Sequence, residues 1–266
     1  MTYSFSPATS KLAVSVSGSI ATVAIDNVAK HNAVDLEMWK ALPSLMEALD
    51  RDPGVRVIVL RGSGQASFAS GADIAEFATV RANAEGGRLY EAANEAAFWA
   101  VAHCSKPVIA MIRGFCLGGG FGLALSCDLR VASESAIFGI PAARLGIGYP
   151  PGAMKLVTAA VGAPTAKDLF FTARRIGAQE ALRLGVVQRL VPDGELEQVT
   201  QALAESIAEN APLTIRAAKA AIDDSVGVGH PGADALALAD LCFDSADAVE
   251  GREAFLQKRR PVFTGR

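Results

Sequence analysis

A glycine-rich segment, GFCLGGGFG at residues 114–122, has the composition of a backbone site for negative charge. It follows an apolar run at residues 108–112 that is typical of a buried strand, and a helical pattern comes next. Glycine permits positive φ and lets a ligand approach the backbone closely. A helix N-terminus leaves N–H groups without partners and a partial positive charge. The segment can therefore stabilise an oxyanion.

The same glycines allow other interpretations. They can serve only to pack a helix tightly against a strand, where glycine removes a side chain. A dinucleotide site is disfavoured, because GSGQAS at residues 62–67 has Ser67 where the third glycine of that motif belongs. The GGG turn lacks the GxGxxG spacing altogether.

A second turn, FASGADI at residues 68–74, also follows a predicted buried strand. Its small residues leave the backbone accessible to a ligand, and Asp73 can cap the helix that follows. Two such turns, each after a strand, can direct two N–H groups at one oxygen.

The elements that must position these turns indicate an α/β fold. We expect a hairpin of strands at residues 11–17 and 20–25, and buried strands at 55–60, 108–112 and 129–132. Predicted helices cover residues 34–50, 72–80, 87–104 and 123–127, and Pro43 should kink the first or mark a new start. From residue 195 we predict helices only, at 195–209, 214–224, 233–243 and 246–259. The predicted organisation is a core at residues 1–194 and a helical region at 195–266.

The composition fits a globular protein with a sizeable core, since 51% of residues are hydrophobic and 20% are charged. The net charge of −3 gives no basic field for nucleic acid or an anionic membrane. The segment at residues 1–10 is too polar for a signal peptide, so we expect a cytoplasmic protein. No metal site is expected, because no CxxC pair occurs among the cysteines, which are Cys104, Cys116, Cys127 and Cys242.

Three segments resemble the crotonase, or enoyl-CoA hydratase/isomerase, family. They are FASGADI at residues 68–74, KPVIAMIRGFCLGGGFGLALSCDLRVAS at 106–133, and EGREAFLQKRRPVF at 250–263. The resemblance covers residues 11–263 and implies a spiral of ββα units followed by a helical trimerisation region. It also implies an acyl-CoA substrate and homotrimers or homohexamers. The thioester oxygen would accept hydrogen bonds from the N–H groups of Ala72 and Gly119.

The resemblance also implies where coenzyme A lies, as part of the substrate thioester and not as a permanently bound cofactor. Lys30 would lie near its phosphates, and residues 72–74, which are Ala72, Asp73 and Ile74, would border the adenine and pantetheine. Lys258 and Phe263 are similar to tail residues that reach the coenzyme A of a neighbouring subunit. A solvated lysine and an apolar plug are their alternative roles.

The sequence departs from the family at both hydratase glutamates. The first lies two residues after the third glycine of the GGG turn, where this chain has Gly122. The second follows a Phe-Gly-x-Pro motif, where this chain has Ala142. Positioned acid/base groups each contribute about 100- to 10,000-fold to a rate, which glycine and alanine cannot supply.

Two side chains are candidates to replace these glutamates. Glu76 lies shortly after Ala72 and can point at the acyl pocket or at solvent. Tyr149 is similar in placement to a tyrosine of the malonyl-type CoA decarboxylases in this superfamily, and it also fits a half-buried loop aromatic. Arg144 can face a carboxylated substrate or pair with an acidic neighbour, and the three histidines fit surface or packing roles.

Three functions remain open at this point. The first is a lyase of the hydratase/isomerase type with unusual acid/base groups. The second is an acyl-CoA decarboxylase in which Tyr149 donates the proton. The third is an acyl-CoA binding protein that has lost catalysis.

Overall fold

The structure is a computed structural model that describes residues 2–3 and 7–266. The segment at residues 1–10, which is too polar for a signal peptide, therefore lies partly outside the described residues. A seven-stranded sheet has the order β1-β2-β3-β4-β6-β8-β11. The expected hairpin is present, with β2 (Leu12–Ser17) antiparallel to β3 (Ile20–Ile25) and β1 (Thr2–Tyr3) beside β2. From β3 onward all neighbours are parallel: β4 (Val57–Gly62), β6 (Val108–Ile112), β8 (Leu129–Ser133) and β11 (Arg189–Val191).

A second sheet of four strands has the order β10-β9-β7-β5. Its parallel strands are β5 (Ser67–Ala69), β7 (Phe115–Leu117) and β9 (Ile137–Gly139), and β10 (Arg175–Gly177) pairs antiparallel to β9. Each of the parallel strands follows a strand of the large sheet, β4, β6 or β8, and precedes a helix. The repeating unit is therefore the predicted ββα spiral.

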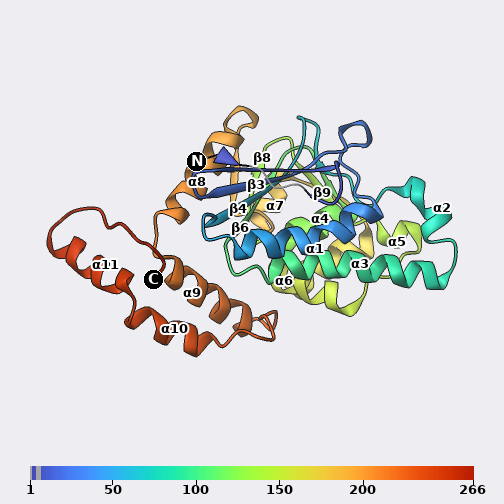
Figure 1. The fold of residues 1–266 in the computed structure, drawn as a ribbon. Helices are drawn as coiled ribbons and strands as arrows, with labels where there is room; N and C mark the ends of the chain where they lie inside the picture. Colours follow the sequence, from blue (N-terminus) through green and yellow to red (C-terminus); the bar gives the residue numbers. More distant parts are fainter. Residues whose placement is uncertain (1, 4–6) are drawn as a thin grey trace.

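The main helices cover one face of the large sheet (Figure 1). They are α1 (Leu36–Arg51), α3 (Ala84–Ala102), α4 (Gly118–Leu125) and α6 (Pro151–Thr172), and they enclose the larger apolar core. Short elements join them: η1 (Val28–Lys30), η2 (Ile74–Glu76), α2 (Phe77–Val80), α5 (Ala142–Leu145) and α7 (Ala178–Arg183). Helix α1 does not start anew at Pro43, because it runs through this residue with its apolar face buried; a kink there stays a prediction.

Two predictions around the glycine turns also need correction. Residues 114–122 are not one turn, because strand β7 lies within them and α4 begins at Gly118, before the predicted helix at 123–127. The predicted helix at 72–80 is the 3₁₀ turn η2 followed by the short α2. Both strands and turns here are too short to show a hydrophobic period.

The chain beyond η3 (Asp193–Glu195) is helical, as predicted: α8 (Leu196–Ala208), α9 (Pro212–Ser225), α10 (Ala235–Phe243) and α11 (Ala246–Leu256). Helix α8 packs on the large sheet on the face away from α1 and forms a second apolar cluster there. The helices α9 to α11 project to one side of the core (Figure 1). The division at residue 195 stays a prediction. Among the described residues, no helix is long and apolar enough to cross a membrane.

Candidate active site

The two glycine turns meet at one edge of the small sheet. Strands β5 and β7 are parallel neighbours, so the turns that follow them lie side by side. Gly71 has φ +109° and Gly118 has φ +51°, and both are left-handed conformations that favour glycine. A Cβ atom on Gly71 would lie 3.2 Å from the carbonyl oxygen of Leu117, and one on Gly118 would lie 3.7 Å from the Cα of Gly71. The two turns therefore pack backbone against backbone.

Each turn presents an N–H group without an acceptor. The Val34 N–H donates to the Gly71 carbonyl at 2.8 Å, and the Asp73 N–H donates to the Val34 carbonyl at 3.0 Å. The intervening Ala72 N–H has no acceptor among the described residues. Gly119 lies in the first turn of α4, which has no side-chain cap, so its N–H is also free within the described chain. Both residues line the same pocket, as the predicted pair of donors to one thioester oxygen requires.

The position of the first absent glutamate is filled by packing. A Cβ atom on Gly122 would lie only 2.6 Å from Cζ of Phe98, whose side chain is 1% exposed. The Phe98 ring also packs edge-on against Trp39, with centroids 5.7 Å apart. A carboxylate side chain at residue 122 would have no room. Ala142, at the second position, is buried and lines the pocket without a polar group.

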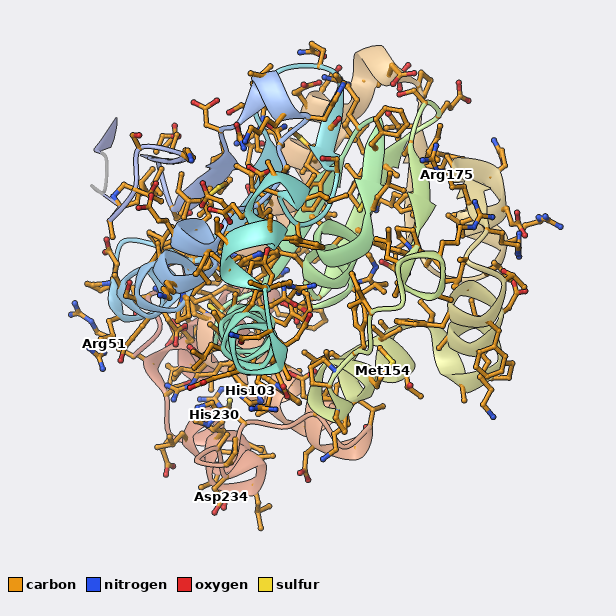
Figure 2. The ribbon with its side chains drawn as sticks, turned by 90° about the vertical axis from the view of Figure 1, so that its right-hand side faces the viewer. Arg51, His103, Met154, Arg175, His230 and Asp234 are labelled. Atoms are coloured by element: carbon orange, nitrogen blue, oxygen red, sulfur yellow. The ribbon has the colours of Figure 1, made fainter. Side chains whose placement is uncertain are left out.

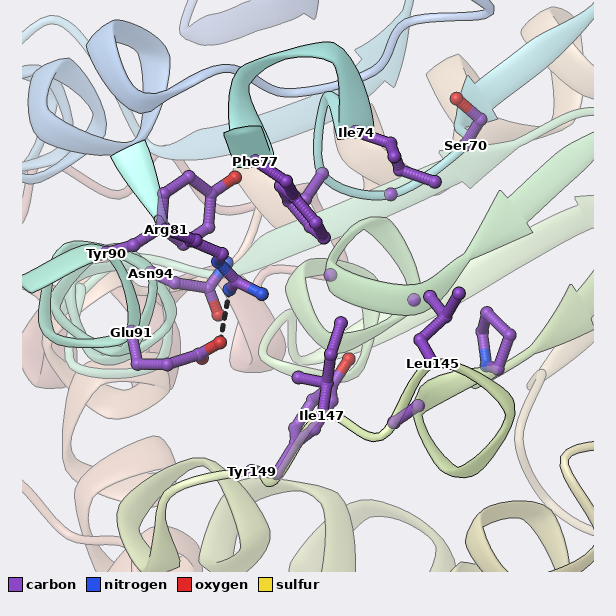
Figure 3. Close-up of a pocket in the computed structure, with 16 residues that line it drawn as sticks. Ser70, Ile74, Phe77, Arg81, Tyr90, Glu91, Asn94, Leu145, Ile147 and Tyr149 are labelled. Carbon is purple, nitrogen blue, oxygen red and sulfur yellow. Dashed lines mark hydrogen bonds and ion pairs between the residues drawn. The ribbon is translucent and has the colours of Figure 1, made fainter. Parts of the chain in front are cut away.

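The pocket contains four polar side chains that the sequence analysis missed: Arg81, Tyr90, Glu91 and Asn94 (Figure 3). The last three lie within about one turn of α3, so they share a face of that helix. Arg81 forms an ion pair with Glu91, and its guanidinium lies 4.4 Å from the ring centroid of Phe77 and 4.0 Å from that of Tyr90. These residues lie between the motifs at residues 68–74 and 106–133, so only the i, i+3 spacing of polar residues on a half-buried helix could have indicated them.

Tyr90 and Asn94 differ in their bonding. The Trp39 Nε1–H donates to the Tyr90 hydroxyl at 2.9 Å, and burial raises the pKa of Tyr90 to about 12. Tyr90 is therefore a neutral support of the pocket wall. Asn94 is buried, and its amide has no partner among the described residues. Its Nδ2 would lie 3.3 Å from a Cβ atom on Gly119, which places the amide beside the oxyanion hole.

Tyr149 lines the pocket, as predicted from its place in the sequence. Its ring packs edge-on against Phe170 at 5.0 Å, and its hydroxyl points into the pocket (Figure 3). Burial raises the pKa of Tyr149, so the hydroxyl stays protonated and can donate a hydrogen bond.

Glu76 does not line this pocket. Its Oε2 accepts the Leu36 N–H at 2.9 Å and so caps the start of α1. The geometry therefore gives no support to the predicted acid/base role of Glu76. Arg144 is exposed and also lies outside the lining residues.

The residues expected around coenzyme A divide into two groups. Lys30 is half-exposed and its Nζ lies 2.6 Å from Oδ2 of Asp73, while Ile74 is 63% exposed at the rim of the pocket. Lys258 and Phe263 do not line the pocket of their own chain. They belong to the tail after α11, where the Phe263 carbonyl accepts a hydrogen bond from Arg56 at 2.5 Å.

The histidines have packing roles away from the pocket. His103 and His230 lie together, with ring centroids 4.9 Å apart (Figure 2). His31 contacts Phe115 edge-on at 5.9 Å. No three His, Cys, Asp or Glu side chains within residues 2–3 and 7–266 are arranged to hold a metal ion.

Comparison with known proteins agrees with this architecture. The family model for enoyl-CoA hydratase/isomerase matches residues 15–266. A short-chain-enoyl-CoA hydratase of Clostridium acetobutylicum is 35% identical over 91% of this chain and 93% of its own length. A carnitinyl-CoA dehydratase of Proteus mirabilis is 33% identical over 94% of this chain and 96% of its own. The crystal structure of an enoyl-CoA hydratase/carnithine racemase from Magnetospirillum magneticum has a TM-score of 0.90 at 35% identity, covering 98% of this chain and 97% of that one.

The fold and the paired glycine turns thus define an acyl-CoA enzyme scaffold of the crotonase superfamily. The chain belongs to the enoyl-CoA hydratase/isomerase family.

Proposed function

We propose that this protein catalyses a hydratase- or isomerase-type reaction on an acyl-CoA by stabilising the enolate of its thioester. The observation that favours this function is the pair of free N–H groups, of Ala72 and Gly119, on one pocket. An enolate puts negative charge on the thioester oxygen, where the two donors would act. Each donor of this kind contributes about 3 kcal/mol to transition-state stabilisation.

Coenzyme A would enter as part of the substrate, and the proposed chemistry needs no permanently bound group. The Lys30 ammonium pairs with Asp73, but the lysine side chain is half-exposed. Lys30 would therefore also be able to contact a phosphate of coenzyme A. Ala72, Asp73 and Ile74 would border the adenine and pantetheine. The exposed Ile74 would then be covered by the bound ligand.

A panel of CoA thioesters followed by mass spectrometry tests this function. The panel holds crotonyl-, longer 2-enoyl-, 3-enoyl-, malonyl- and methylmalonyl-CoA. We expect gain of water by a 2-enoyl-CoA or conversion of a 3-enoyl-CoA to its conjugated isomer. Tight binding of the thioesters without conversion of any would contradict an enzymatic role and indicate an acyl-CoA binding protein.

A decarboxylase is a second candidate, favoured by the protonated hydroxyl of Tyr149 in the pocket. Loss of carbon dioxide from a malonyl-type CoA leaves the same enolate, which then needs only a proton. Loss of turnover in Tyr149→Phe, with unchanged affinity for CoA thioesters, would support this role. Normal turnover of Tyr149→Phe would exclude it.

We also propose that the chain forms homotrimers or homohexamers through its C-terminal helices. Their large apolar side chains are exposed in the single chain, including Leu236 at 73%, Phe243 at 79% and Phe255 at 83%. Such a concentration of exposed apolar surface is typical of an interface. Lys258 and Phe263 would then reach the coenzyme A of a neighbouring subunit. Light scattering coupled to gel filtration tests this, and a stable monomer would contradict it.

A further inference from the structure

We propose that Glu91, on helix α3, is the acid/base residue of this site and replaces the two carboxylates absent at Gly122 and Ala142. This inference rests on the proposed enolate chemistry. It assigns the proton transfers to an element that supplies neither of the family's glutamates.

The position of Glu91 in the pocket is the first observation that favours an acid/base role. It is the only Asp or Glu among the described residues that line the pocket. Asn94, three residues further along α3, has its amide beside Gly119, as shown by the 3.3 Å from Nδ2 to a Cβ placed there. Residues three apart on a helix are neighbours, with Cβ atoms about 5–6 Å apart. Glu91 is therefore the neighbour of Asn94 on the side of α3 that lines the pocket, and we expect the first carbons of an acyl chain to extend past it.

Orientation is fixed by Arg81. The Arg81 side chain is 13% exposed, and its guanidinium lies over the rings of Phe77 and Tyr90 and donates to Oε1 of Glu91. The second carboxylate oxygen, Oε2, accepts no hydrogen bond from the described residues. A hollow that shares Arg81 and Glu91 with the pocket continues past them and leaves room for an acyl chain. Glu91 thus has one oxygen held and one available for proton transfer (Figure 3).

The charge environment suits a reversible base. Burial raises the pKa of Glu91 and Glu95 adds to this, while the charge and hydrogen bond of Arg81 oppose it. The other titratable groups that face it from the pocket wall are Tyr90 and Tyr149, whose pKa values burial raises, so both remain neutral. A carboxylate with a raised pKa is a stronger base towards the C2 proton than an ordinary surface glutamate.

One carboxylate is enough for isomerisation of a 3-enoyl-CoA. Glu91 takes a proton from C2, and the electrons of that C–H bond form the dienolate whose charge lies on the thioester oxygen. The protonated Glu91 then donates the same proton to C4, and the double bond moves from C3=C4 to C2=C3. No water, oxidant or second carboxylate is consumed. Ala72 and Gly119 hold the oxygen throughout.

The test measures isomerisation of a 3-enoyl-CoA by the full-length wild type, Glu91→Gln and Glu85→Gln. Glu85 is an exposed carboxylate on the same helix and is the matched control. We expect Glu91→Gln to lose about 100- to 10,000-fold in kcat. Its affinity for the thioester, measured by calorimetry, should be kept. Glu85→Gln should behave as the wild type.

Each outcome separates the two proposals. A normal rate in Glu91→Gln, with an active wild type, would overturn the role of Glu91 and leave the proposed function intact. A wild type that binds the 2-enoyl- and 3-enoyl-CoA thioesters and converts none of them would overturn both. If Glu91→Gln fails to fold, Glu91→Asp and Arg81→Gln provide the readout. Arg81 lowers the pKa of Glu91, so Arg81→Gln should move the acidic limb of the rate profile to higher pH, and an unmoved limb in both variants would refute the inference.

Discussion

The close packing of the Phe98 ring on Gly122, where the first hydratase glutamate is expected, makes a direct stability prediction. Gly122 lies inside α4, where a change to alanine normally helps, because alanine favours a helix over glycine by about 0.8–1 kcal/mol. Here the new Cβ atom would lie 2.6 Å from Cζ and 2.9 Å from Cε2 of Phe98. The Phe98 ring cannot withdraw freely, since it packs against Trp39 in the core. Overpacking of this kind typically costs about 1–3 kcal/mol.

The two opposing effects leave a net loss of up to about 2 kcal/mol for Gly122→Ala. Gly87→Ala is the matched control, because Gly87 is also helical and a Cβ there meets nothing within 4 Å. That variant should gain up to about 1 kcal/mol. Replacement of the ring in Phe98→Leu should reduce the loss in free energy of unfolding that Gly122→Ala causes, compared with the same change in the wild type.

Urea denaturation followed by circular dichroism measures these differences. We expect Gly122→Ala and Gly87→Ala to move the midpoint in opposite directions with unchanged slopes. Equal stabilisation by both variants would refute the reasoning, because residue 122 would then have room for a side chain. The absence of the family's glutamate would in that case need an explanation other than packing.

Three further predictions follow from individual contacts. Asp35→Ala should lower the free energy of unfolding by about 1–2 kcal/mol, because the buried Asp35 caps α1 by accepting the Met38 N–H at 2.9 Å; urea titration measures this. Gly119→Pro should lose about 100-fold in turnover relative to Gly119→Ala, which keeps the N–H, and equal rates would remove Gly119 from the oxyanion hole. The hydrogen bond from Arg259 lowers the pKa of Glu250 to about 2. The stabilisation of the fold by this ion pair is therefore fully present above about pH 4.5 and is lost as the pH falls towards 2. The difference in Tm between wild type and Glu250→Gln should therefore shrink below about pH 4, and a constant difference would contradict the assignment.

The long and strongly patterned elements could be predicted from the sequence. The buried strand at Val108–Ile112 is a continuous apolar run that follows Pro107, and the C-terminal helices are separated by Pro212 and by the glycines at residues 227–232. The strands of the small sheet could not be found, because β5, β7 and β9 have three residues each and show no period. Helix α1 passes through Pro43 because the burial of its apolar face outweighs a local break.

The position of the pocket could be predicted from its backbone turns. Turns rich in small residues after strands indicate free N–H groups, and the structure brings Ala72 and Gly119 to one pocket. Side-chain chemistry was harder to predict, because it depends on which helix faces the pocket. Glu76 turns towards the start of α1 and accepts a hydrogen bond there. Glu91 lines the pocket from α3, which lies outside the segments that resemble the family, so nothing in its sequence indicated which elements it would face.

The central claim is that two backbone donors hold the thioester oxygen. A crystal structure with a bound, non-reacting acyl-CoA analogue tests it most directly. The account predicts that the oxygen lies about 2.7–3.1 Å from the nitrogens of both Ala72 and Gly119, with the acyl chain passing Glu91. An acyl-CoA bound in this pocket with its thioester oxygen beyond hydrogen-bond distance of both nitrogens would contradict it.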